Sequence, residues 1–275
     1  TDTYLRHVVA DKDRHLVYAL ALAQGDVPVL RAMLADDADA AFDLDDLLQN
    51  LARDYKSVHA HEARLLDEPE RFIRNHLKSE VRRTAPEVER LNRHAVDALE
   101  ARLTQWESRM ASIEERCADP DWVNTVIDVA AHRFWLSASE GWQWLMPRYL
   151  EAWAYSDVML TGLLQIGMEW RDYWTVGERQ LLQRMTAVTS AQSMEILPLL
   201  ETLNKVAGFG WFEGDGEEER MAILNLRWGQ YYLALGQLDK ARVHLADVTA
   251  LLPKEGHALR QEVAHEVETL AQIED

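Results

Sequence analysis

The densest group of side chains that could bind a metal ion is an acidic stretch between residues 36 and 46. Its members are Asp36, Asp37, Asp39, Asp43, Asp45 and Asp46. An EF-hand loop needs a glycine at its sixth position, which is missing here. The stretch is also one residue short of the D-D-x-x-D pattern with which terpene synthases bind a metal diphosphate. We interpret it as an acidic linker whose later aspartates stabilise the N-terminus of the next helix. We expect no metal ion or other cofactor.

Two histidines have neighbours that could support catalysis. Glu262 and His265 have the spacing of one half of a di-iron site, but such a site needs a second pair and two further glutamates. His132 follows Asp128 by one helical turn, so that the carboxylate could hold the imidazole. A structural histidine is the simpler interpretation. The sequence contains no G-x-S-x-G, H-E-x-x-H, Walker or kinase signature, and we expect no catalytic residues.

The only cysteine, Cys117, belongs to an apolar pattern that predicts a long helix. After Pro86, apolar residues recur at alternating spacings of three and four: Val96, Leu99, Leu103, Trp106, Met110, Ile113 and Cys117. This is the seam of a coiled-coil-like helix. It predicts a continuous spine helix over residues 86–117. Because Cys117 is in register with the seam, we expect a buried small hydrophobe and not a nucleophile.

Composition favours an all-α protein, because strand-like alternation of β-branched residues is nearly absent. The net charge of −18 argues against binding to nucleic acid or to anionic membranes, since both depend on cationic side chains. No apolar run approaches the roughly 20 residues that span a bilayer, and the first residues lack the apolar core of a signal peptide. We therefore expect an acidic cytoplasmic protein.

Seven of the ten tryptophans lie between residues 122 and 174: Trp122, Trp135, Trp142, Trp144, Trp153, Trp170 and Trp174. Such a density fits a core of large side chains, an aromatic ligand pocket or a protein-binding hot spot, and core is the favoured interpretation. Trp142 and Trp144 are two residues apart and cannot face the same side of a helix. At least one of this pair is predicted to reach a groove or the surface, where it could bind a partner.

Residues 208–216, GFGWFEGDG, form the clearest break in the chain. Four glycines free the backbone, yet Phe209, Trp211 and Phe212 would not be left in water without a reason. These aromatic side chains either attach the loop to the body of the protein or form an exposed binding tip.

Residues 222–255 specify a helical hairpin. A first helix ends at Gly236, and a second begins at Leu238 and cannot continue past Pro253. The segment resembles a tetratricopeptide repeat. Counted from Ala222, the family positions are filled by Gly229, Tyr232, Gly236, Ala241, Leu245 and Pro253. The segment departs from the family pattern at Asn225, Trp228 and Val248.

The resemblance implies an α-solenoid at the C-terminus, because such repeats need stacked neighbours to bury their apolar faces. It also implies a partner-binding groove on the first helix, at Ile223, Leu226, Gln230 and Leu233. Family members that hold a C-terminal carboxylate use a lysine and an asparagine where this chain has Leu226 and Gln230. That class of ligand is therefore disfavoured.

The predicted organisation is an N-terminal helical region over 1–118, a tryptophan-rich helical region over 119–207 and a tetratricopeptide-like hairpin with a capping helix over 208–275, or one continuous domain. The leading hypothesis is a non-catalytic adaptor or regulatory protein that binds a protein or peptide. One alternative is an acidic inhibitor or immunity-type protein that occludes a basic toxin or enzyme. Another is a helical magnesium-dependent enzyme with an aromatic pocket. Self-association is left open.

Overall fold

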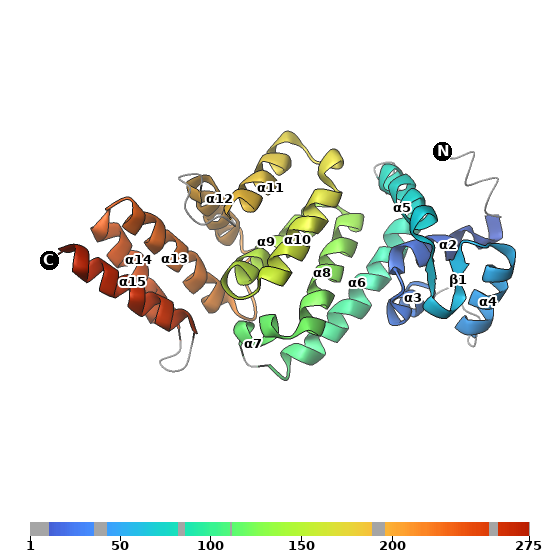
Figure 1. The fold of residues 1–275 in the computed structure, drawn as a ribbon, viewed down its shortest axis with the longest axis horizontal. Coiled ribbons are helices and arrows are strands. Elements are labelled where there is room, and N and C mark those ends of the chain that lie inside the picture. Colours follow the sequence, from blue (N-terminus) through green and yellow to red (C-terminus); the bar gives the residue numbers. More distant parts are fainter. Residues whose placement is uncertain are drawn as a thin grey trace. The chain divides into compact units, whose positions relative to one another are not determined.

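The computed structural model describes residues 11–35, 43–81, 86–110, 112–188, 196–252 and 258–274, and this part of the chain is all-α (Figure 1). The sheet found within these residues is a short antiparallel pair, β1 (Val58–His59) and β2 (Arg64–Leu65). None of the described helices combines the length and the apolar character needed to cross a membrane. The predicted all-α class is confirmed.

The chain divides into two compact units. Unit 1 comprises residues 1–104 and 131–141, and unit 2 comprises residues 105–130 and 142–275. These boundaries differ from the predicted ones near residues 118 and 207. All three fall inside helices, namely α6, α8 and α9, and no glycine- or proline-rich linker marks such a boundary in the sequence.

Unit 1 contains α2 (Asp11–Ala23), α3 (Val27–Met33), α4 (Leu44–Asp54), β1, the 3-10 helix η2 (Ala60–Glu62), β2, α5 (Asp67–Val81) and most of α6 (Pro86–Glu107). Helix α2 is central, because it packs against α3, α5 and β2 and every side chain in residues 16–23 is buried. Asp43 caps α4 by accepting a hydrogen bond from the Asp45 backbone N–H. This agrees with the expected role of the later aspartates, while Asp36, Asp37 and Asp39 lie outside the described residues.

The predicted spine helix over 86–117 is wrong, because the structure has two helices there. Helix α6 ends at Glu107, and α7 (Ile113–Ala118) begins after Ser112, whose hydroxyl accepts a hydrogen bond from the Glu115 N–H. Ser112-x-x-Glu115 has the spacing of a helix start, and this signal was overlooked in favour of the apolar seam. Cys117 is buried as predicted, and burial raises the pKa of its thiol. It therefore stays protonated and unreactive.

His132 is a structural histidine of unit 1. It lies on α8 (Pro120–Leu136) with 6% of its surface exposed, and its Nδ1 is 2.8 Å from Oδ1 of the fully buried Asn92. The Asn92 amide donates to the Val88 carbonyl, so its oxygen is left to accept the imidazole N–H. Burial lowers the pKa of His132 to about 4; the charge of Arg74 adds to this and that of Asp26 opposes it.

We expect His132 to make the protein less stable as the pH falls from about 6.5 towards about 4. In that window the unfolded chain binds a proton that the folded chain does not, so protonation favours unfolding. This difference in pKa corresponds to a loss of about 3 kcal/mol in the free energy of unfolding. Urea unfolding at a series of pH values should show a steeper loss for the wild type than for His132→Gln, which cannot titrate. Parallel curves for the two proteins would contradict this.

Unit 2 contains α7, most of α8, most of α9 (Ala138–Tyr155), α10 (Asp157–Glu169), the 3-10 helix η3 (Arg171–Tyr173), α11 (Val176–Val188), α12 (Ile196–Gly208), α13 (Glu217–Ala234), α14 (Leu238–Leu251) and α15 (Ala258–Glu274). From α10 onward each helix packs against the next one in the chain (yellow to red in Figure 1). Most of the tryptophans form core, as expected. Trp122, Trp142, Trp170 and Trp174 are each at most 5% exposed.

Helices α13 and α14 form the predicted hairpin. Gly236 adopts a left-handed φ of 68° at the turn, and Gly229 and Ala241 lie where the two helices meet. A Cβ atom added at Gly229 would lie 2.9 Å from Cδ2 of Leu245 and 3.7 Å from the carbonyl oxygen of Ala241. The backbone approach that the small residues predicted is therefore present.

Candidate interaction surface

One side of the α13–α14 hairpin carries a cluster of aromatic side chains that are neither fully buried nor fully exposed. We call Trp228, Tyr231, Tyr232 and His244 the aromatic surface. The first three come from neighbouring turns of α13, and His244 comes from the middle of α14. His244 is held in place by Asn225, whose Oδ1 lies 2.8 Å from the imidazole Nδ1.

Three rings of the aromatic surface are nearly parallel. The centroid of the Tyr232 ring lies 5.5 Å from the ring centroids of both Trp228 and His244, with interplanar angles of 22° and 17°. The centroids of Trp228 and His244 are 5.9 Å apart, and the angle between these two ring planes is 15°. Tyr231 stands across them, at 82° to Trp228 and 60° to Tyr232. These separations are those of favourable offset and edge-to-face pairs, so the rings hold one another in place.

The charges near these rings define which ligands they would attract. Lys240 places its Nζ over the Tyr232 ring, 5.0 Å from the centroid. Burial lowers the pKa of His244, although the carboxylate of Asp247 opposes this shift. The imidazole is therefore neutral at pH 7 and contributes as an aromatic ring, not as a cation.

The aromatic surface is formed in part by residues where the hairpin departs from the tetratricopeptide pattern. Asn225 and Trp228 occupy two of the three departing positions, and Asn225 orients the histidine that stacks on Trp228. Sequence reasoning noted both departures but did not combine them. Their spacing of three on one helix face, opposite a histidine on the second helix, was the available signal.

The predicted groove residues on the first helix do not form an open groove. Ile223 and Leu226 have no exposed surface and belong to the core, which corrects their assignment as partner contacts. Gln230 is half-buried and donates hydrogen bonds to Glu262 and Glu266 of α15, at 2.8 and 2.9 Å. Leu233 is half-buried. The chain's own last helix thus engages this side of α13.

The aromatic residues predicted outside the hairpin are divided between core and surface. Trp142 and Phe212 are buried, at 5% and 2% exposed, so neither is placed to contact a partner. Trp144 is half-buried, as the opposite orientation of the Trp142 and Trp144 pair required, and its ring lies 5.0 Å from the guanidinium carbon of Arg148. Trp211 is also half-buried. In this loop Phe212 therefore attaches the backbone to the body of unit 2. Phe209 is 74% exposed, so the expectation that the loop's aromatic side chains are shielded from water is wrong for this residue.

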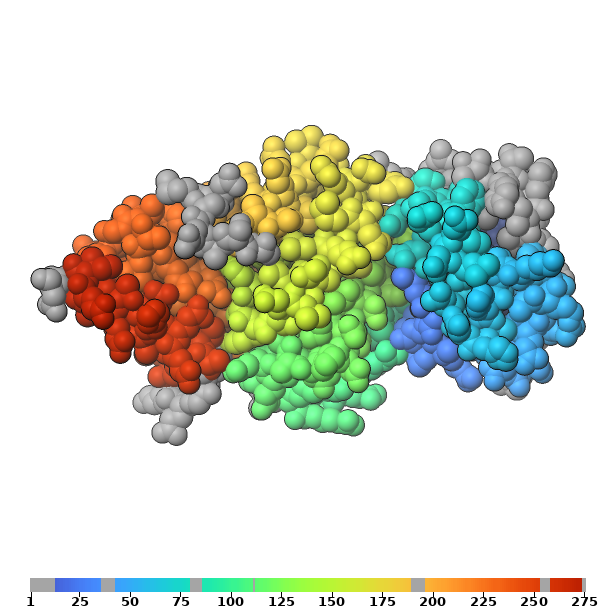
Figure 2. Space-filling model, in the orientation of Figure 1, coloured from blue at the N-terminus to red at the C-terminus, as the bar shows by residue number. Residues whose placement is uncertain are grey.

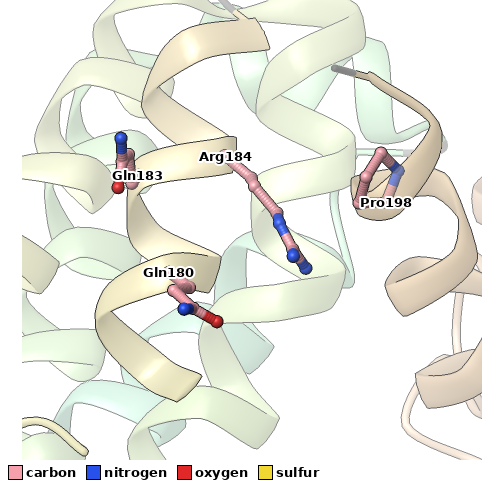
Figure 3. Close-up of a pocket in the computed structure, with 4 residues that line it drawn as sticks. All are labelled: Gln180, Gln183, Arg184 and Pro198. Atoms are coloured by element: carbon pink, nitrogen blue, oxygen red, sulfur yellow. The ribbon is translucent and has the colours of Figure 1, made fainter. Parts of the chain in front are cut away.

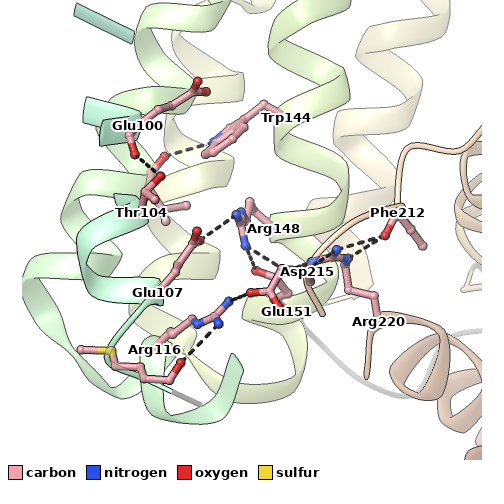
Figure 4. Close-up of polar contacts among 12 residues, drawn as sticks. Glu100, Thr104, Glu107, Arg116, Trp144, Arg148, Glu151, Phe212, Asp215 and Arg220 are labelled. Atoms are coloured by element: carbon pink, nitrogen blue, oxygen red, sulfur yellow. Dashed lines mark hydrogen bonds and ion pairs between the residues drawn. The ribbon is translucent and has the colours of Figure 1, made fainter. Parts of the chain in front are cut away.

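A buried ionic network fixes that loop (Figure 4). Glu151 has no exposed surface and accepts hydrogen bonds from Nη1 of Arg148 at 2.9 Å and from Nη1 of Arg220 at 2.6 Å. Arg148 also reaches Glu107, and Arg220 donates to the backbone carbonyls of Phe212 and Asp215. The negative charges of two carboxylates, Glu107 and Glu151, balance the positive charges of the two guanidiniums. All four groups form hydrogen bonds or ion pairs within the network. We interpret it as structural.

A shallow hollow of about 280 Å³ lies between α11 and α12, lined by Gln180, Gln183, Arg184 and Pro198 (Figure 3). Among the described residues, its lining offers amide and guanidinium groups and neither a carboxylate nor a nucleophile. Within the described part of the chain, no group of three or more His, Cys, Asp or Glu side chains is arranged to hold a metal ion. Glu262 of the candidate di-iron pair is instead bonded to Arg227 and Gln230.

No protein-family model matches the chain, and no curated protein or solved structure is significantly similar to it.

Proposed function

We propose that this chain is a non-catalytic helical protein that binds another protein through the aromatic surface of the α13–α14 hairpin. The observation that carries the proposal is the set of half-buried rings of Trp228, Tyr231, Tyr232 and His244, fixed by mutual stacking. Tryptophan and tyrosine are enriched in protein interfaces because they offer a large apolar area at a low cost in conformational entropy. Rings that are already ordered keep that cost lower still.

The resemblance of the hairpin to a tetratricopeptide repeat supports the same class of function, because proteins of that family present helical surfaces to peptides and proteins. The binding face proposed here differs from the usual groove, since α15 engages Gln230. The surfaces of α14 and α15 face solvent in Figure 2 (orange to red).

We expect that Trp228→Leu combined with Tyr231→Leu will reduce recovery of a specific partner in affinity capture by at least about tenfold. Loss of two anchoring rings at an interface costs more than ~1.4 kcal/mol of binding free energy. Both residues are half-buried, so leucine can maintain the helix and part of the packing. The measurement is quantitative capture with the full chain as bait, together with circular dichroism to verify unchanged helicity.

Trp106→Leu supplies the matched control, because Trp106 is a half-buried tryptophan on α6. A partner that depends on the aromatic surface is retained by this control and lost by the double variant. Equal recovery by all three proteins would contradict the proposal. Leu226→Asp is unsuitable, since it would place an unpaired charge in the core and unfold the hairpin.

An acidic inhibitor that occludes a basic toxin or enzyme is a second candidate, favoured by the distribution of charge. Unit 2 has 26 acidic residues against 13 basic ones, and so carries most of the net charge of −18. Electrostatic steering would make association fast and strongly dependent on salt. This candidate predicts an association rate that falls steeply with salt and does not change in the Trp228→Leu variant.

A further inference from the structure

The aromatic surface offers a place for a cation from outside the chain. Tryptophan is the aromatic side chain that binds cations most strongly. Trp228 is half-buried, and among the described residues its ring contacts are with other aromatic rings, with no cation placed over it. The neighbouring ring already shows the chemistry, because Lys240 of the same chain lies over Tyr232.

Two acidic residues lie on the helix faces that carry the rings, Asp247 one turn after His244 and Glu218 nearly three turns before Trp228. Glu218, Asn225 and Tyr232 are spaced seven residues apart on α13, so the exposed carboxylate of Glu218 lies on the side that carries the rings. On α14, Asp247 follows His244 by three residues, and its charge acts on the imidazole. A positively charged chain that follows this face would therefore meet aromatic rings and carboxylates in succession.

We infer that the partner presents a basic segment and that an arginine of this segment packs on the aromatic surface, with further basic side chains near Glu218 and Asp247. The inference rests on the proposed function and specifies the class of partner. Arginine is favoured over lysine because its planar guanidinium stacks on aromatic rings and is more weakly hydrated. The excess of 26 acidic over 13 basic residues in unit 2 attracts such a segment before contact.

Fluorescence anisotropy with labelled peptides tests the inference on the full chain. The probes are a peptide in which Arg alternates with Ser and Gly, and two peptides of the same design with Lys or Glu in place of Arg. We expect the Arg peptide to bind more tightly than the Lys peptide, and the Glu peptide not to bind. Trp228→Leu should weaken binding of the Arg peptide by about three- to tenfold, the range expected for loss of one cation–π contact.

One double variant and two control variants separate the contribution of the charges from that of the rings. Glu218→Gln with Asp247→Asn should weaken binding at low salt more than at high salt, because exposed charges are screened. Trp106→Leu and Glu201→Gln, which alter a half-buried tryptophan on α6 and an exposed glutamate on α12, should leave binding unchanged.

Two results would overturn the inference. One is equal affinity of the wild type and Trp228→Leu for the Arg peptide, since net charge alone would then explain binding. The other is tighter binding of the Glu peptide than of the Arg peptide. Either result would leave the proposed function intact if capture of a partner still depended on Trp228 and Tyr231. Failure of the inference can therefore be distinguished from failure of the proposed function.

Discussion

Replacing Glu151 with glutamine should lower the free energy of unfolding by about 3–5 kcal/mol, the range measured when one member of a buried ion pair is removed. Glu151 has no exposed surface and lies between the guanidiniums of Arg148 and Arg220. A glutamine has no charge to balance them and turns an amide donor towards two other donors. Burial by itself lowers the pKa of Arg148, but Glu151 and Glu107 outweigh this and raise it, so the arginine stays charged.

The loss of stability should be greatest in the segment that Arg220 holds in place. This arginine also donates to the carbonyls of Phe212 and Asp215, so its loss of orientation should loosen the loop before α13. Hydrogen exchange in residues 209–220 should therefore increase more than exchange in α9, and denaturant unfolding should give the total loss. Glu201→Gln is the matched control, because Glu201 is exposed on α12 and its replacement should change stability by less than about 0.5 kcal/mol.

A double-mutant cycle with Arg220→Met would identify the cause. If the two residues stabilise the protein through their ion pair, the double variant should be more stable than the sum of the two single losses predicts. A loss of less than about 1 kcal/mol for Glu151→Gln would show that water reaches the network, and our interpretation of it as a structural clamp would be wrong.

Gly229→Leu should destabilise the α13–α14 hairpin by about 2–3 kcal/mol or more, which is the cost of forcing extra atoms into a close-packed contact. Even the first added carbon would lie 2.9 Å from Cδ2 and 3.0 Å from Cγ of Leu245. Leucine is a better helix former than glycine by roughly 0.8 kcal/mol, so the net loss must come from packing. Thermal unfolding should show a melting temperature lower by several degrees.

Ala241→Leu tests the same contact from the other helix and should cost about 1–3 kcal/mol, because Ala241 has no exposed surface. Ala246→Leu is the matched control, since Ala246 is exposed on the same helix, and it should be neutral within about 0.5 kcal/mol. If Ala241→Leu and Ala246→Leu had equal stabilities, the two helices would not approach closely at Gly229. The aromatic surface would then lack the rigid support on which its proposed role depends.

Several local elements followed from the sequence because each depends on residues close together in the chain. Thr175 and Glu178 were readable as a capping box, and their side chains cap α11 with hydrogen bonds of 2.7 and 3.3 Å to each other's backbone N–H groups. The hairpin turn at Gly236 was readable in the same way, because a left-handed φ favours glycine. The break before α7 was readable as well from Ser112 and Glu115, but this signal was missed because the apolar seam runs on across it.

The sequence by itself determined the all-α class, the helical hairpin with its close contact at Gly229 and the burial of most of the tryptophans, because helix periodicity and small-residue spacing are local properties. Only the tertiary structure decided which apolar residues of α13 are core and which are accessible. Ile223 and Leu226 have the same apolar character as a binding groove would need, yet they have no exposed surface. The ionic network likewise could not be predicted from the sequence. It joins Glu107, Arg148, Glu151 and Arg220, and 113 positions separate the first of these residues from the last. Long-range pairing depends on how helices pack, and one sequence without its fold does not specify it.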